Sequence, residues 1–301
     1  MKVMVYHNPV LLNESVDGLE IDPKGIYVDV TFGGGGHSRE ILKRLDNEGR
    51  LYAFDQDEEA FQNTIEDDRF ELIHGNFKYI NRFLRVYGVT KVNGILADLG
   101  VSSHQFDVAD RGFSTRFDAL LDMRMDANSS LTAYDIINTY DEEALQNLLF
   151  NYGELRNAKA LAKTIVEARE IESIKTSFQL KEILKRFLPN NKAHKIMAQI
   201  FQAIRIEVNQ ELEVLKEFLE QTPNLLMSGG KLSIISYHSL EDRLVKRFIK
   251  NGIFSGEPKK DFYGNTDTPF KKPKKLIIPT NEEIKLNNRA RSAKLRIVAR
   301  K

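Results

Sequence analysis

Short apolar runs alternate with amphipathic segments over the first hundred residues of the chain. Four of these runs have the length and composition of strands: Ile26 to Phe32, Arg50 to Asp55, Phe70 to His74 and Gly94 to Asp98. Apolar residues recur at helical spacing between them, as at Ile41, Leu42 and Leu45. Strands separated by helices form right-handed crossovers, so the sequence predicts a doubly wound α/β core around a parallel sheet.

The strand pattern is lost after the fourth run and returns only late in the chain. From about Phe106 to about Gln199, helical spacing dominates. A longer helix is expected to run on from Ile200 to Leu219. An apolar run then resumes the sheet pattern at Leu232 to Ser236, and Leu295 to Ala299 could form a closing strand.

A helical segment bracketed by sheet elements favours an insertion into one α/β domain over two domains in series. The sequence therefore predicts a core domain formed by residues 1–105 and 200–301. It predicts an inserted helical domain, with a role in substrate recognition, over residues 106–199.

Composition narrows the class of protein. The 301 residues include no cysteine, which excludes disulfides, thiolate zinc sites and a cysteine nucleophile. No apolar run is long enough to span a membrane and no signal pattern opens the chain, so a cytoplasmic location is expected.

The overall charge of +1 hides an asymmetry between the two parts of the chain. From Lys231 to the end there are 18 Lys and Arg against 7 Asp and Glu, a net charge of +11. Such a basic region suits a phosphate backbone, and a solvated lysine-rich surface is the alternative.

The clearest local signal is the run of four glycines, Gly33 to Gly36, directly after the first predicted strand. Without Cβ atoms, such a turn lets backbone approach a ligand closely at the carboxyl end of a strand. A flexible turn without a ligand is the alternative. Asp55 ends the second strand, where a carboxylate can accept hydrogen bonds from ribose hydroxyls. This placement suits NAD and S-adenosylmethionine equally, although the glycine spacing fits the dehydrogenase pattern poorly.

Asp98 ends the fourth predicted strand and opens the sequence Asp98-Leu99-Gly100-Val101-Ser102-Ser103. An ionised carboxylate at this position can accept a hydrogen bond from an amino group. A helix-capping role for the Asp and Ser residues is the alternative.

Taken together, the motifs resemble those of the RsmH (MraW) family of class I, Rossmann-like methyltransferases, which methylate cytosine N4 in small-subunit rRNA. The motifs are TFGGGGHS, DLGVSS, RGFS, LDMRMD, FQAIRIEVNQEL, SYHSLEDRLVKRF and RARSAKLR, and they occur in order over nearly the whole chain.

The resemblance implies S-adenosylmethionine as cofactor and a cytidine in the decoding region of 16S rRNA, within the small ribosomal subunit, as substrate. The cofactor residues that it implies are Gly35, Gly36, His37, Asp55, Phe77, Asp98 and Gln105. Asp98 is also our candidate catalytic residue, because an acceptor that orients the amino group promotes its attack on a methyl carbon. The two roles of Asp98 stay open.

Three other classes of function remain to be separated from this one. A methyltransferase acting on another RNA, a protein or a small molecule would share the cofactor half. An RNA-binding factor would keep the basic surface without binding the cofactor. A nicotinamide oxidoreductase would bind NAD at the same glycine turn.

Overall fold

A computed structural model describes residues 9–258, 262 and 268–301 of the chain, except the side chain of Ser103. Contacts divide the chain into two compact units, Met1–Gly100 with Leu212–Lys301 and Val101–Glu211. Each unit has a hydrophobic core of its own.

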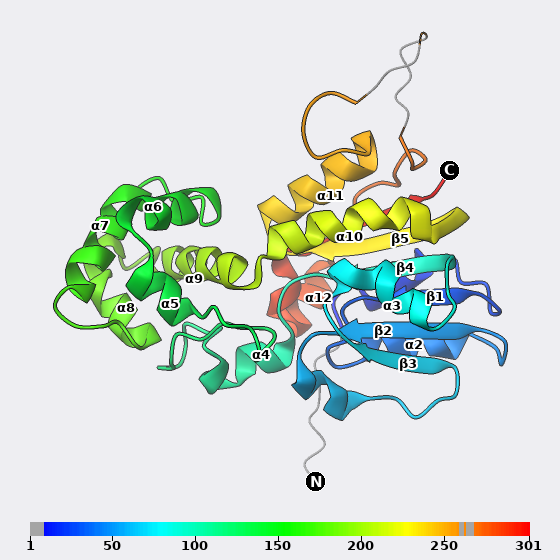
Figure 1. Cartoon of the computed structure of the whole chain (residues 1–301), viewed down its shortest axis with the longest axis horizontal. Coiled ribbons are helices and arrows are strands. Elements are labelled where there is room, and N and C mark those ends of the chain that lie inside the picture. The colour runs from blue at the N-terminus through cyan, green and yellow to red at the C-terminus, as the bar shows by residue number, and fades with distance from the viewer. Residues whose placement is uncertain (1–8, 259–261, 263–267) are drawn as a thin grey trace. The chain divides into compact units, whose positions relative to one another are not determined.

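The first unit is built on one six-stranded sheet with the order β3-β2-β1-β4-β5-β6 (Figure 1). The strands are β1 Ile26–Asp29, β2 Arg50–Asp55, β3 Phe70–His74, β4 Val92–Asp98, β5 Leu226–Ser236 and β6 Lys294–Ala299. All pairs are parallel except β5 with β6, which is antiparallel. The chain order reverses between β1 and β4, and ligands bind outside the carboxyl ends of strands at such a switch point.

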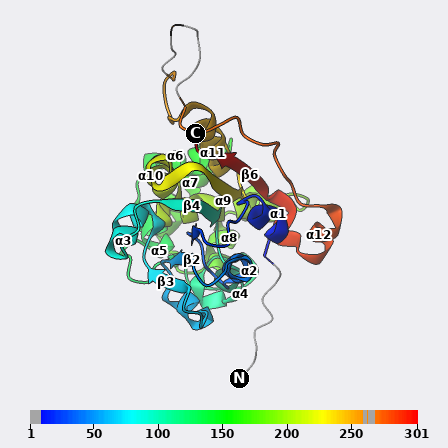
Figure 2. The ribbon, with the colours of Figure 1, turned by 90° about the vertical axis from the view of Figure 1, so that its right-hand side faces the viewer.

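Helices cover both faces of this sheet (Figure 2). The helices of the unit are α1 Leu12–Asp17, α2 Gly36–Arg44, α3 Ile80–Val86, α10 Glu211–Leu225, α11 Ser239–Asn251 and α12 Asn281–Leu286, with Glu211 itself assigned to the other unit. Apolar side chains of α1 and α2 pack on one face, and those of α3, α10 and α11 pack on the other. The predicted doubly wound α/β fold is confirmed.

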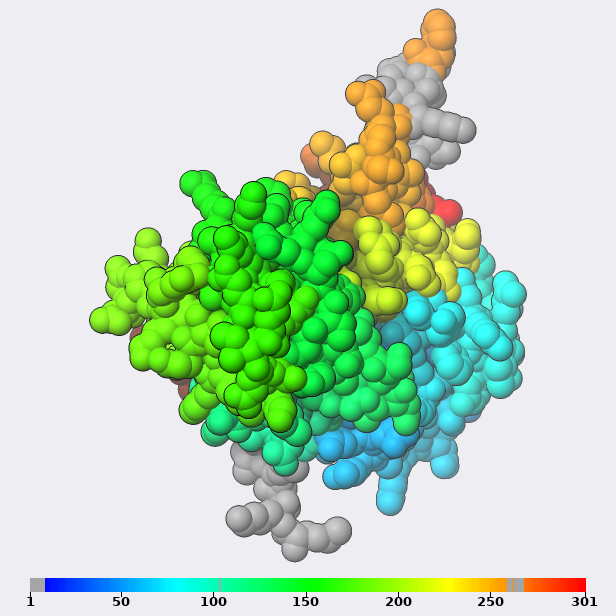
Figure 3. Space-filling model, turned by 60° about the vertical axis from the view of Figure 1, so that its left-hand side comes forward, coloured from blue at the N-terminus to red at the C-terminus, as the bar shows by residue number. Residues whose placement is uncertain are grey.

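The second unit is helical and is drawn mainly in green in Figure 3. Its helices are α4 Ser103–Asp107, α5 Ala133–Thr139, α6 Glu142–Asn151, α7 Ala158–Arg169, α8 Ser177–Ile183 and α9 Ala193–Asn209. The apolar faces of α5 to α9 form one buried cluster that includes Ile137, Leu161 and Ile204. The predicted limits, residues 106–199, lie inside this unit.

Several predicted elements have different bounds in the structure. The expected helix from Ile200 to Leu219 is wrong as a single element, because Gln210 adopts a left-handed conformation (φ 49°) that separates α9 from α10. Its apolar spacing continues across the break, so periodicity alone could not reveal it. The first strand ends at Asp29 and the fifth begins at Leu226, six residues before the predicted start. Among the described residues, no helix is both long and apolar enough to cross a membrane.

Candidate active site

The candidate site lies where β1, β2, β4 and β5 end, along one edge of the sheet. These four strands are parallel neighbours, so the residues that follow them converge there. Thr31 follows β1, and its hydroxyl accepts a hydrogen bond of 2.7 Å from the backbone N–H of Asp98 at the end of β4. This bond ties the glycine turn to the end of the neighbouring strand.

The glycine turn leads directly into α2. Gly35 caps this helix with φ +74°, and a Cβ atom there would lie 2.9 Å from the ring of Phe32. A Cβ on Gly36 would lie 2.1 Å from Cγ of Pro9. The protein's own packing therefore requires both glycines. Within the described part of the chain no side chain caps the N-terminus of α2, so N–H groups of its first turn are available to an anionic group.

His37 is buried in the first turn of α2, with 5% of the residue exposed. Its Nε2 lies 3.2 Å from the carbonyl oxygen of Val10, which makes Nε2 the donor in the neutral ring. Burial lowers the pKa of His37, so the neutral form is favoured at pH 7. Its Nδ1 faces Oδ2 of Asp98 at 3.9 Å.

Asp55, at the end of β2, holds the turn from the neighbouring strand. Its Oδ2 accepts a hydrogen bond of 2.8 Å from the N–H of Gly33, and its Oδ1 accepts one of 2.9 Å from the N–H of Asp57. Burial raises the pKa of Asp55 to about 6. Each carboxylate oxygen has a second lone pair, so acceptor capacity remains for a ribose hydroxyl.

Asp98 meets a residue that the sequence analysis did not assign. The hydroxyl of Tyr237, which follows β5, donates a hydrogen bond of 2.7 Å to Oδ1 of Asp98. The Asp98 side chain is 22% exposed, and burial of the rest raises its pKa to about 6. Burial and the neighbouring carboxylate raise the pKa of Tyr237 well above its usual range, so the phenol remains a donor. Tyr237 belongs to the quoted motif SYHSLEDRLVKRF, which is the signal that could have revealed it.

Asp29 is the second unassigned residue, and it is fully buried at the end of β1. Its Oδ2 accepts a hydrogen bond of 2.7 Å from the hydroxyl of Ser38, and its Oδ1 accepts one of 3.1 Å from the N–H of Thr31. Burial raises its pKa to about 6. Asp29 therefore holds the glycine turn by hydrogen bonds to a residue before it and a residue after it.

The two remaining predicted site residues have different surroundings. Phe77 is half-buried after β3, and its ring meets that of Phe218 edge-on at 5.3 Å between centroids. Gln105 is buried in the helical unit, where it forms a reciprocal capping box with Ser102 at the start of α4. The predicted site residues Gly35, Gly36, His37, Asp55, Phe77 and Asp98 therefore belong to one unit, and Gln105 belongs to the other.

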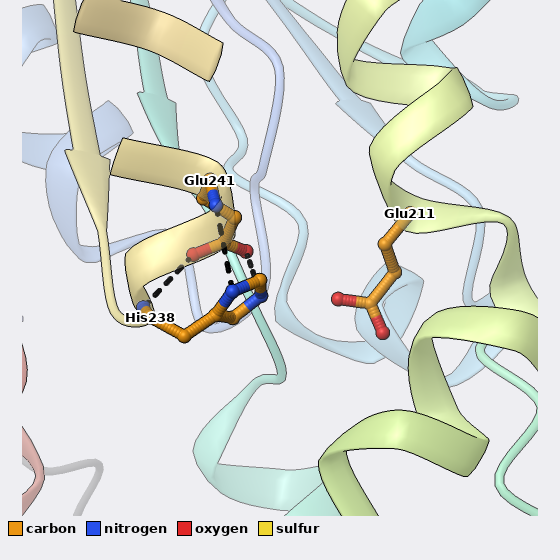
Figure 4. A group of neighbouring side chains, drawn as sticks. All are labelled: Glu211, His238 and Glu241. Atoms are coloured by element: carbon orange, nitrogen blue, oxygen red, sulfur yellow. Dashed lines mark hydrogen bonds and ion pairs between the residues drawn. The ribbon is translucent and has the colours of Figure 1, made fainter. Parts of the chain in front are cut away.

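Tyr237 is in turn held by the start of α11. Oε2 of Glu241 accepts hydrogen bonds from the backbone N–H groups of Tyr237, at 2.9 Å, and His238, at 3.3 Å. The His238 ring folds back over this carboxylate, with Nδ1 accepting from the N–H of Glu241 and Nε2 lying 3.1 Å from its Oε1 (Figure 4). This reciprocal cap fixes the backbone that presents Tyr237 to Asp98.

Comparison with known proteins identifies relatives of this chain. A sequence model of the MraW methylase family matches residues 4–301. A protein of Flavobacterium johnsoniae named ribosomal RNA small subunit methyltransferase H is 66% identical over 98% of this chain and 97% of its own length. A protein of the same name from Christiangramia forsetii is 65% identical over 100% of this chain and 99% of its own length. A solved rRNA methylase from Streptococcus thermophilus superposes with a TM-score of 0.39 at 14% identity, covering 99% of each chain.

Proposed function

The chain belongs to the MraW methylase family, and on this premise we propose that it methylates N4 of a cytidine in the decoding region of 16S rRNA. The methyl donor is S-adenosylmethionine. The names of the relatives support small-subunit rRNA as substrate. The choice of cytosine N4 rests on the family resemblance together with an acceptor carboxylate at the end of β4.

The residues present fit S-adenosylmethionine. The uncapped N-terminus of α2, at Gly36 and His37, can bind the carboxylate of its methionine part. Asp55 keeps acceptor capacity for the ribose hydroxyls, and Phe77 offers a half-buried ring for the adenine. When bound, the cofactor supplies a methyl group activated by a sulfonium.

Asp98 is the residue that we propose to act on the base. Its Oδ1 is occupied by the Tyr237 hydroxyl, which fixes the plane of the carboxylate and leaves Oδ2 as the acceptor for an amino N–H. A hydrogen bond to this oxygen orients the nitrogen lone pair toward the methyl carbon, which is a proximity effect. With a pKa of about 6, the carboxylate is ionised at neutral pH and can take the proton that the nitrogen releases after attack.

The cytosine must leave its stack to reach such an acceptor, and the rest of the RNA must be held elsewhere. We propose that the helical unit serves this recognition. From Lys181 to Lys195 it carries five Lys and Arg against one Glu. Phe178, in the same helical unit, is 44% exposed, and Nζ of Lys181 lies 5.6 Å from the centroid of the Phe178 ring. Exposed aromatic rings beside cations are typical of surfaces on which RNA bases stack.

The observation that carries the proposal is the Asp98–Tyr237 pair beside the glycine turn. The test is methyl transfer from tritiated S-adenosylmethionine to 30S subunits, free 16S rRNA, tRNA and a ribosomal protein fraction, followed by mapping of the labelled nucleotide. We expect label on one cytidine of 16S rRNA, at N4. Label confined to protein or tRNA, or on a ring carbon, would refute the proposal.

A further inference from the structure

A cavity of about 360 Å³ lies in the α/β unit, and none of the residues that line it is assigned above to the cofactor or to the target base. Three segments line it: Tyr237 to Ser239 at the start of α11, Ile278, Pro279 and Ile284 around the start of α12, and Arg291 to Lys294 at the start of β6. Tyr237 links the cavity to the site, because it lines the cavity while its hydroxyl donates to Asp98 at 2.7 Å.

The walls of this cavity are fixed by the fold. Ile277 and Leu295 exchange two backbone hydrogen bonds, of 3.1 and 2.9 Å, which anchor the segment before α12 beside the first residues of β6. Ala290 and Ala293, which flank Arg291 and Ser292 in the chain, are buried, and Ala293 itself lines the cavity. The segment that carries Ile278 and Pro279 is therefore held in place by backbone hydrogen bonds to β6.

The lining combines an apolar wall with cations and hydroxyls. Ile278, Pro279 and Ile284 supply the apolar part, and Ser239 and Ser292 supply hydroxyls. Arg291 is exposed, and no carboxylate among the described residues forms an ion pair with it. Lys294 lies 3.3 Å from a carboxylate, that of Asp242, which it shares with Arg296 at 2.7 Å. Positive charge at the cavity is thus incompletely neutralised.

The approach to the cavity is also basic. Four exposed lysines precede Ile278, one of the lining residues, by three to seven positions: Lys271, Lys272, Lys274 and Lys275. Lys274 pairs with Glu20 at 2.7 Å. Exposed lysines that lead to a partly apolar cavity with an exposed arginine match a path for a phosphate backbone that ends in a place for one base.

We infer that this cavity binds one nucleotide of the substrate RNA next to the target cytidine, an inference that rests on the proposed function. Arg291 binds the phosphate, and the base packs on the wall formed by Tyr237 and Pro279. Single-stranded RNA is recognised by splayed bases on aromatic side chains together with phosphate contacts. The volume lies at the lower end of the range of about 300 to 1,000 Å³ typical of small-ligand sites, which suits one nucleotide and exceeds the needs of a bare anion.

The first test removes the unpaired cation. Arg291→Ala is compared with Arg85→Ala, which removes another exposed arginine, from α3 of the same unit. Uridine 5′-monophosphate, which lacks the amino group that Asp98 is proposed to accept, and inorganic phosphate are titrated into each protein by calorimetry. We expect Arg291→Ala to weaken nucleotide binding about tenfold, the size of one charge-assisted hydrogen bond, and Arg85→Ala to leave it unchanged. Equal affinity of the wild type for the nucleotide and for phosphate would refute a nucleotide site.

The second test fills the cavity without removing a charge. Ser292 lines the cavity and is exposed, so Ser292→Trp adds bulk there while Arg291 remains. Both variants should raise the KM for 30S subunits about tenfold, while the Kd for S-adenosylmethionine stays within twofold of the wild type. An unchanged KM in both variants would overturn the inference.

These outcomes separate the two proposals. If wild-type protein places no label on a 16S rRNA cytidine, the proposed function fails. If it labels that cytidine and the two variants do so with the wild-type KM, only the cavity inference fails.

Discussion

Replacing Asp98 with asparagine tests the role of the acceptor most directly. In the wild type, Oδ1 accepts from Tyr237 and Oδ2 remains for the base amino group. In Asp98→Asn, the amide oxygen takes over the bond from the tyrosine, because a phenol needs an acceptor. The amide NH₂ then occupies the position of Oδ2 and presents hydrogens to the amino group of the base.

The size of the effect follows from the lost contact. A hydrogen bond to a charged acceptor contributes about 1.5 to 3 kcal/mol, and each 1.4 kcal/mol corresponds to about a factor of ten in rate. If the bond forms mainly in the transition state, kcat should fall about 10- to 150-fold, with the Kd for S-adenosylmethionine within a few-fold of the wild type. The amide NH₂ group, which faces the amino group of the base, lowers kcat further, because two hydrogen-bond donors then meet.

The assay is tritium transfer to 30S subunits at saturating cofactor, with the Kd measured separately by calorimetry. Asp17→Asn is the control, since it removes a surface carboxylate that pairs with Arg44 at 2.6 Å and lies outside the site. Wild-type kcat should fall as the pH drops through about 6, where Asp98 becomes protonated, and this limb should be absent from Asp98→Asn. Weakened cofactor binding with kcat recovered at saturation would assign Asp98 to the cofactor, and normal values of both would refute any role.

Three further predictions follow from the same geometry. Gly35→Val should abolish S-adenosylmethionine binding in calorimetry, because its left-handed backbone and the nearby Phe32 ring exclude a branched side chain. Gly88→Val is the control: its φ is similar, but the space around it is open, so this variant should bind the cofactor normally. Binding of NAD by the wild type would refute S-adenosylmethionine as the cofactor. Tyr237→Phe should lower kcat and move the acidic limb of the rate profile to higher pH, since loss of the donor raises the pKa of Asp98; an unmoved limb would contradict the pairing. The free energy of unfolding of the ligand-free protein should increase between pH 7 and pH 5, because three carboxyls with a pKa near 6 bind protons in the folded state before they do in the unfolded chain. Each carboxyl contributes up to about 1.4 kcal/mol per pH unit. A free energy of unfolding that decreases over this range, measured by denaturant titration, would refute the prediction.

The pattern of apolar residues determined much of the fold by itself. Strands β2 and β3 have the predicted bounds: the middle of β2 is a continuous apolar run typical of a buried parallel strand, and β3, at the edge of the sheet, alternates apolar with polar residues. The glycine turn and the carboxylates after β2 and β4 could be placed on one edge, because the carboxyl ends of parallel strands meet there. Local signals of this kind depend only on neighbours in sequence.

Contacts between distant segments were decided by the tertiary structure. Nothing local to Tyr237 shows that its hydroxyl reaches Asp98, 139 residues away, because that bond depends on β5 pairing with β4. Gly36 reads as a ligand contact in sequence, and the structure adds a second reason for a glycine there, because Pro9 occupies the space where a Cβ would lie. The cavity beside Arg291 exists only because Ile277 pairs with Leu295 and brings three separate segments together. Strand pairing brings these segments together through hydrogen bonds between residues far apart in the chain. The periodicity of apolar residues along the sequence does not show which segments pair.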